Sequence, residues 1–254
     1  MDIATLQRLS ARTWPGLEQD RLGEWELRAG AGFTARANSA LPIGRPGVEL
    51  DEAMDRVSGW YAARGLTPRL QVPSELPGTD PAVGFEPVDA WCDARGWLAE
   101  PWTLVMVRNE LPAAAAPVEG VQLQWADTPE AAWLNLYHYR AAELPSAAVQ
   151  VITAAPARYL TAHADGAAIG IGRAAVVENL VVLTAIEVAA GYRRQGHGTA
   201  ITEALAADGA LRGATLSALQ VFAHNAPAVR LYRSRGYRDH HRYRYRTPNT
   251  AGDG

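Results

Sequence analysis

Six consecutive residues have the types and spacing of an anion-binding loop: Arg193, Arg194, Gln195, Gly196, His197 and Gly198. An apolar run at 181–188 precedes them and an alanine-rich run at 199–211 follows, which predicts a strand, a turn and a helix. Glycines let the backbone approach a ligand, and the first amides of a helix point outward at the positive end of its dipole. With two arginines beside them, we expect a phosphate or pyrophosphate. The alternative is a glycine-eased turn whose arginines face solvent.

The elements around this loop predict an α+β fold. Short turns at 165–166 and 178–179 join three expected strands into an antiparallel meander that leads into the loop. Strand–helix–strand units follow, with a helix at 227–234 that Gly236 ends and a last strand at 237–245. The sequence therefore predicts a mixed, mostly antiparallel sheet with flanking helices.

The second half of the chain resembles the GCN5-related N-acetyltransferase (GNAT) superfamily over residues 119–246. The residues that carry the resemblance are Ile186-Glu187-Val188, the loop from Arg193 to Gly198, Asn225, Leu231-Tyr232 and Gly236-Tyr237. The resemblance implies the acyl-CoA N-acyltransferase fold, in which the fourth strand splays from the fifth. It also implies acetyl-CoA as the donor co-substrate, with no metal.

The resemblance assigns donor-binding roles to matched positions. The pantetheine arm would bind the strand edge at Ile186, Val188 and Ala190. The pyrophosphate would bind the amides of Gln195, Gly196, His197, Gly198 and Thr199, flanked by Arg193 and Arg194. Asn225 would cap the next helix or hydrogen-bond the pantetheine, and one side chain could do both.

The resemblance also assigns catalytic roles. Tyr232 would be the general acid that protonates the departing thiolate, the alternative being a core packing role. The Val188 N–H would hold the oxyanion. Glu187 is the candidate general base and Glu178 a second, although an ordinary solvated carboxylate explains either. Strand alternation places Glu187 on the face opposite Val188.

The first half of the chain has no such loop, yet its Trp60-Tyr61 to Gly65-Leu66 segment echoes Leu231-Tyr232 to Gly236-Tyr237. We therefore expect a tandem protein with a degenerate GNAT-like domain at 1–111, a linker at 112–118, the acetyltransferase domain at 119–246 and a tail at 247–254. Residues 25–28 and 33–38 flank Gly30-Ala31-Gly32, which predicts a hairpin. Arg36, Asn38 and Ser39 follow it as candidate acceptor-site residues, although hairpin solubility explains them equally well.

Composition narrows the function classes. A chain of 254 residues with a net charge of -3 gives no global attraction to nucleic acid or anionic membrane. The alternating basic and aromatic residues at 241–246 fit a final strand with one packed aromatic face and one solvated basic face. All 24 basic residues are arginines, which excludes a lysine nucleophile, and the single cysteine, Cys92, excludes an intramolecular disulfide. We expect a cytoplasmic monomer or homodimer.

The leading functional hypothesis is transfer of an acetyl group from acetyl-CoA to a primary amine, by direct attack on the thioester. The expected acceptor is a small molecule, because the sequence contains no run of basic or acidic surface residues suited to binding a polymer. The alternative is a non-catalytic acyl-CoA-binding or sensing protein that keeps the loop and lacks the chemistry.

Overall fold

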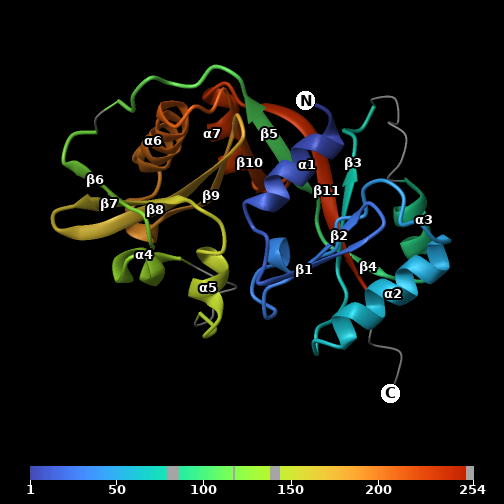
Figure 1. Ribbon diagram of the computed structural model, residues 1–254. Helices are drawn as coiled ribbons and strands as arrows, with labels where there is room; N and C mark the ends of the chain where they lie inside the picture. The colour runs from blue at the N-terminus through green and yellow to red at the C-terminus, as the bar shows by residue number, and fades with distance from the viewer. Residues whose placement is uncertain (79–85, 117, 138–143, 250–254) are drawn as a thin grey trace. The chain divides into compact units, whose positions relative to one another are not determined.

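The computed structural model describes residues 1–78, 86–116, 118–137 and 144–249 (Figure 1). The chain forms two compact units. Unit 1 comprises residues 1–105, 222–224 and 239–254, and unit 2 comprises residues 106–221 and 225–238. The predicted domain limits follow the order of the chain, whereas nearly all of the last strand belongs to unit 1. The domain limits given above for the two halves of the sequence therefore stay a prediction.

The described residues of unit 1 form three α-helices and two groups of strands. Its elements are α1 (Ile3–Arg12), β1 (Glu18–Leu22), β2 (Trp25–Ala29), the 3-10 turn η1 (Ala35–Ala37), α2 (Leu50–Ala62), β3 (Leu70–Ser74), α3 (Glu86–Ala94), β4 (Leu98–Ala99), the first half of β5 (Thr103–Arg108) and β11 (Arg238–Thr247). β11 pairs antiparallel with β3 and with β4. Along α2, Met54, Val57 and Tyr61 are buried at the three- and four-residue spacing of an amphipathic helix.

The hairpin predicted around Gly30-Ala31-Gly32 is wrong. β2 pairs antiparallel with β1, which precedes it, and residues 33–38 contain η1 instead of a second strand. Asn38 explains the difference: its Oδ1 accepts hydrogen bonds from Gly30 N at 2.8 Å and Gly32 N at 2.9 Å. Its Nδ2 donates to Phe33 O at 2.6 Å. These bonds close the segment as a loop, because they use backbone groups that a strand pair would need.

The basic face of β11 differs from the solvated face that the sequence predicts. Arg246 is 1% exposed, and its Nε donates to Asp89 Oδ1 at 2.7 Å. Arg244 also pairs with Asp89, and Arg242 lies over the Trp102 ring at 3.9 Å from its centroid. The acidic partners on α3 neutralise the arginines, so that alternation along β11 reflects packing on both faces.

Unit 2 contains most of the sheet. Its elements are the second half of β5, β6 (Val121–Ala126), α4 (Ala131–Leu136), α5 (Ala148–Ile152), β7 (Arg158–Ala164), β8 (Ala167–Val177), β9 (Leu180–Val188), the 3-10 turn η2 (Ala190–Tyr192), α6 (His197–Leu211), β10 (Leu216–Phe222, to Val221) and α7 (Ala226–Ser234). The strand order is β5-β10-β9-β8-β7-β6. The meander β7-β8-β9 is antiparallel and β10 is parallel to β9. The predicted α+β class, with a mixed and mostly antiparallel sheet, is confirmed.

The two faces of this sheet carry different helices (Figure 1). A Cβ at Gly170 or Gly172 would lie 2.6 Å from the side chain of Ile201 or Leu205, so α6 packs on the face to which these glycines belong. Trp133 of α4 packs edge-on against Tyr159, which pairs with Arg173 and so shares the opposite face. The glycines let α6 pack close to the strands, because a side chain at either position would occupy the space that the helix fills.

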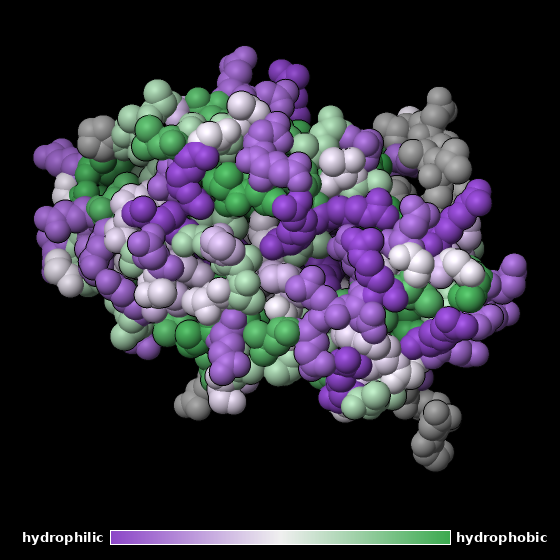
Figure 2. All heavy atoms as spheres, viewed as in Figure 1, coloured by the Kyte–Doolittle hydropathy of each residue, from purple (hydrophilic) through white to green (hydrophobic). Residues whose placement is uncertain are grey.

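On the face drawn in Figure 2, hydrophobic residues occur as separate patches between hydrophilic ones. Among the helices of the described residues, none is both long enough and apolar enough to span a membrane.

Candidate active site

The arginine- and glycine-containing loop lies where the sequence places it, between β9 and α6. Arg194 and Gly196 have left-handed φ angles of 64° and 88°, which turn the chain sharply into the helix. Gly196 is the N-cap of α6 and provides no side-chain cap, and apart from its chain neighbours no described residue has an atom within 4 Å of where its Cβ would be. The first amides of α6 therefore start a helix beside open space, which suits an anion.

The side chains of the loop brace it. Arg193 Nε donates to Val188 O at 2.9 Å, and Gln195 Nε2 donates to Gly191 O at 3.2 Å. His197 is 8% exposed, and its Nδ1 has no hydrogen-bond partner among the described residues. A buried imidazole nitrogen without a partner at the start of a helix fits a site that a ligand completes. Thr199 follows within the first turn of α6.

β9 and β10 separate next to this loop. Their parallel pairing runs from Leu180 with Leu216 to Leu183 with Leu219 and continues no further between the described residues. β9 nevertheless extends to Val188, and so its edge toward β10 is unpaired over residues 184–188. This is the splay that the resemblance implies, and an unpaired strand edge can bind an extended ligand through backbone hydrogen bonds.

The end of β9 presents its backbone to this opening. Ala189 N donates to Ile169 O at 2.9 Å, toward β8. Because successive amides of a strand alternate in direction, the Val188 N–H points away from β8, as an oxyanion contact requires. Ile186 lies on β9 as expected. Ala190 lies in η2, beyond the strand, and so it is not part of the extended edge.

A bulge in β9 sets which side chains share a face. Ile171 pairs with Glu187 and Arg173 pairs with Thr184, so two residues of β9, Ala185 and Ile186, lie opposite one residue of β8. Ala185 has a left-handed φ of 53°, which is the sign of an irregular strand. Glu187 faces away from α6, and Val188 pairs with Gly170 on the α6 face. The predicted opposite facing of Glu187 and Val188 agrees with this arrangement.

The two downstream motif residues lie on α7. Asn225 is its N-cap, and Asn225 Oδ1 accepts from Ala228 N at 3.3 Å, so the predicted capping role is confirmed. Tyr232 lies two turns later, with its ring 6.0 Å from that of Tyr237. Loss of solvation raises the pKa of Tyr232 to about 12. The phenol therefore stays protonated at neutral pH, as a general acid requires.

Glu178, the second candidate base, lies away from the opening. Glu178 has a left-handed φ of 53° in the turn before β9, at the opposite end of that strand from Val188. Glu178 is therefore not brought to the splay with Glu187.

The acceptor candidates predicted in the first half belong to unit 1. Asn38 and Ser39 are buried, and both act within unit 1: Asn38 closes its own loop, and Ser39 Oγ accepts from Arg28 Nη2 at 3.2 Å. Arg36 lies in η1, the 3-10 turn within the loop that Asn38 closes. An acceptor role for these residues stays a prediction.

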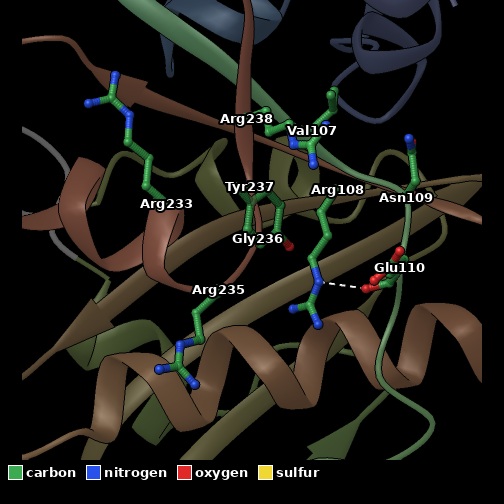
Figure 3. A pocket seen from close by; sticks show the side chains of 9 residues that line it. All are labelled: Val107, Arg108, Asn109, Glu110, Arg233, Arg235, Gly236, Tyr237 and Arg238. Atoms are coloured by element: carbon green, nitrogen blue, oxygen red, sulfur yellow. Dashed lines mark hydrogen bonds between the residues drawn. The ribbon is translucent and has the colours of Figure 1, made fainter.

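A concavity of about 410 Å³ opens in unit 2 at the carboxyl end of α7 (Figure 3). Four arginines line it: Arg108, Arg233, Arg235 and Arg238. Arg108 is fixed by Glu203, with Nη1 2.7 Å from Oε1. In Figure 3, Arg233 points away from Arg108 and Arg235. The concavity is separated from the Asn225 end by the nine residues of α7, about 13 Å, and none of the residues expected to bind the donor lines it.

Comparisons with known proteins decide the family. Residues 1–246 match the family described as "Probable histone acetyltransferase Rv0428c C-terminal". The chain belongs to this family of GNAT acetyltransferases. It is 33% identical over 257 residues to the "Probable histone acetyltransferase Rv0428c" of Mycobacterium tuberculosis, covering 98% of this chain and 75% of that protein.

Solved structures show the same fold. A GCN5-related N-acetyltransferase from Kribbella flavida has a TM-score of 0.72 at 18% identity, covering 99% of this chain and 97% of that chain. A tandem GNAT protein from the clavulanic acid biosynthesis pathway has a TM-score of 0.61 at 17% identity, covering 88% of this chain and 77% of that chain. The family match and the relative from Mycobacterium tuberculosis show that the protein is an N-acetyltransferase, which favours the enzyme over the alternative of a binding protein. The degenerate first half stays a prediction.

Proposed function

We propose that this protein transfers the acetyl group of acetyl-CoA to a primary amine of a small molecule, by direct attack on the thioester. The splay between β9 and β10 beside the loop carries the proposal. It combines an unpaired strand edge for the pantetheine with a helix start for the pyrophosphate. The residues present fit the donor, since the Gly196 cradle is open and the amides behind it begin a helix.

The donor would bind along residues named above. Ile186 and Val188 would hydrogen-bond the pantetheine, and the amides from Gln195 to Thr199 would bind the pyrophosphate. Arg193 and Arg194 would add positive charge, although Arg193 Nε already donates to Val188 O. The cap of α7 uses Oδ1 of Asn225, and the NH2 group of the same side chain can contact the donor.

Each proton and bond in the transfer has a place. The amine nitrogen attacks the thioester carbonyl, a C–N bond forms and the C–S bond breaks. The Val188 N–H stabilises the oxyanion of the tetrahedral intermediate. Glu187 takes the proton that the amine loses, directly or through water, and Tyr232 gives its phenolic proton to the leaving thiolate. The raised pKa of Tyr232 supports this assignment, because the residue carries the proton before the step.

The charge around the site supports a small acceptor over a basic polypeptide. Arg193 and Arg194 are exposed in the loop, and Arg230 is exposed on α7. This concentration of positive charge does not favour a lysine- and arginine-rich tail. The name of the Mycobacterium tuberculosis relative specifies a histone acceptor, so a basic lysine peptide belongs in the test.

The test is thiol release from acetyl-CoA with a panel of small primary amines and, in parallel, a basic lysine peptide. We expect turnover with a small amine, and Tyr232→Phe to lower kcat by about 10²- to 10⁴-fold while the KM for acetyl-CoA changes little. Turnover with the peptide alone would refute the small-molecule acceptor. A Tyr232→Phe variant with the original kcat would refute the general-acid role.

A further inference from the structure

The Thr184 hydroxyl is buried and makes no hydrogen bond to the described residues. Thr184 is 5% exposed, and its Oγ1 atom has no partner within hydrogen-bonding distance. A buried hydroxyl without a partner is destabilising, and such groups are rare in folded proteins. Valine has nearly the same shape and would avoid this cost, so the hydroxyl calls for a role that the fold itself does not supply.

The position of Thr184 relates it to the site. It is the first residue of β9 after the pairing with β10 ends at Leu183, so it begins the splay. The bulge at Ala185 and Ile186 then puts Thr184 and Glu187 on one face of β9, since their partners Arg173 and Ile171 are two residues apart on β8. Both side chains therefore face away from α6, along one side of the opened strand.

The buried side chains on this face of the sheet include apolar residues and one arginine. Ile171, the cross-strand partner of Glu187, is fully buried, and so is Trp133 of α4 on the same face. Arg173, the cross-strand partner of Thr184, is also fully buried, with Nη2 3.4 Å from Ala155 O. Buried waters occupy such places, where polar atoms without a protein partner interrupt apolar packing.

We propose that Thr184 is a positioning residue that holds the water through which Glu187 deprotonates the acceptor amine. The water donates one hydrogen bond to Thr184 Oγ1 and one to the Glu187 carboxylate, which leaves its lone pair toward the amine. As the C–N bond forms, the amine proton passes to the water and a proton of the water passes to Glu187. This inference rests on the proposed function, in which Glu187 is the base.

The test compares Thr184→Val with Thr184→Ser and with a matched control. Thr202→Val is the control, because Thr202 is also buried and its Oγ1 donates to Gly198 O at 2.7 Å. We expect Thr184→Val to keep or raise Tm and keep the KM for acetyl-CoA, while kcat falls at least tenfold and the acid limb of its pH profile moves. Thr184→Ser should restore kcat, and Thr202→Val should lower Tm without moving the pH profile.

A double-variant cycle with Glu187→Gln separates the possible failures. If Glu187→Gln lowers kcat and Thr184→Val lowers it no further in that background, the two residues act in one proton path. Should Glu187→Gln leave kcat unchanged, the proposed base fails and this inference fails with it. Should Glu187→Gln lower kcat while Thr184→Val does not, only this inference fails. A loss of Tm in Thr184→Val as large as in Thr202→Val would also overturn it.

Discussion

His241 makes unit 1 sensitive to acid. It is fully buried on β11, where its Nε2 lies 2.9 Å from Gln7 Nε2 and its Nδ1 lies 2.8 Å from His240 Nδ1. The amide of Gln7 is a donor, which requires His241 to accept at Nε2 and to carry its proton at Nδ1. Burial, together with the charge of His240, lowers the pKa of His241 to about 3. The folded protein therefore keeps this ring neutral.

The sign of the stability change follows from this pKa. A free histidine has a pKa near 6.5, so the unfolded chain binds the proton first as the pH falls. The contribution of His241 is complete above about pH 6.5 and is lost between there and pH 3. At pH 5, 1.5 pH units below the unfolded pKa, the loss is about 2 kcal/mol, and below pH 3 it approaches about 5 kcal/mol. One buried ring thus removes a large part of the stability of an ordinary domain.

Urea denaturation followed by tryptophan fluorescence at pH 7 and pH 5 measures this loss. We expect His241→Gln to be less stable than the original protein at pH 7, because the new side chain does not repeat both contacts. Its free energy of unfolding should fall by about 2 kcal/mol less between pH 7 and pH 5. The exposed His224→Gln is the control and should keep the original pH dependence. Equal losses in the original protein and in His241→Gln would refute the reasoning.

Three further variants test the site and its frame. Gly196→Val should weaken acetyl-CoA binding at least tenfold, as measured by calorimetry. A side chain at a φ of 88° costs about 1–2 kcal/mol, and valine would fill the space beside the first amides of α6. Gly191→Ala is the control and should bind normally, because φ at Gly191 is not left-handed. Asn225→Ala should lose about 1 kcal/mol in urea denaturation, whereas Asn225→Ser should keep most of it. Asn38→Ala should lower Tm and leave the KM for the acceptor unchanged; a raised acceptor KM at unchanged Tm would instead support the predicted acceptor role.

Local chemistry made the second half of the chain predictable. The turns at 165–166 and 178–179, the loop from Arg193 to Gly198 and the glycine after α7 each act on neighbouring residues, so their sequence signals suffice. The hairpin failed because Asn38 binds backbone groups up to eight residues away. The pairing of β11 with β3, about 170 residues earlier, depends on tertiary contacts that no local pattern records.

Thr184 shows why part of the site could not be predicted. Side chains alternate along a regular strand, so residues 184 and 187, three apart, should face opposite sides of the sheet. The bulge adds one residue to β9 between them, opposite a single residue of β8, and so reverses that relation. Its left-handed residue is Ala185, where a glycine or asparagine would have signalled the irregularity. The same bulge brings Glu187 onto the face of Thr184, so the proposed proton path exists only because the strand is irregular.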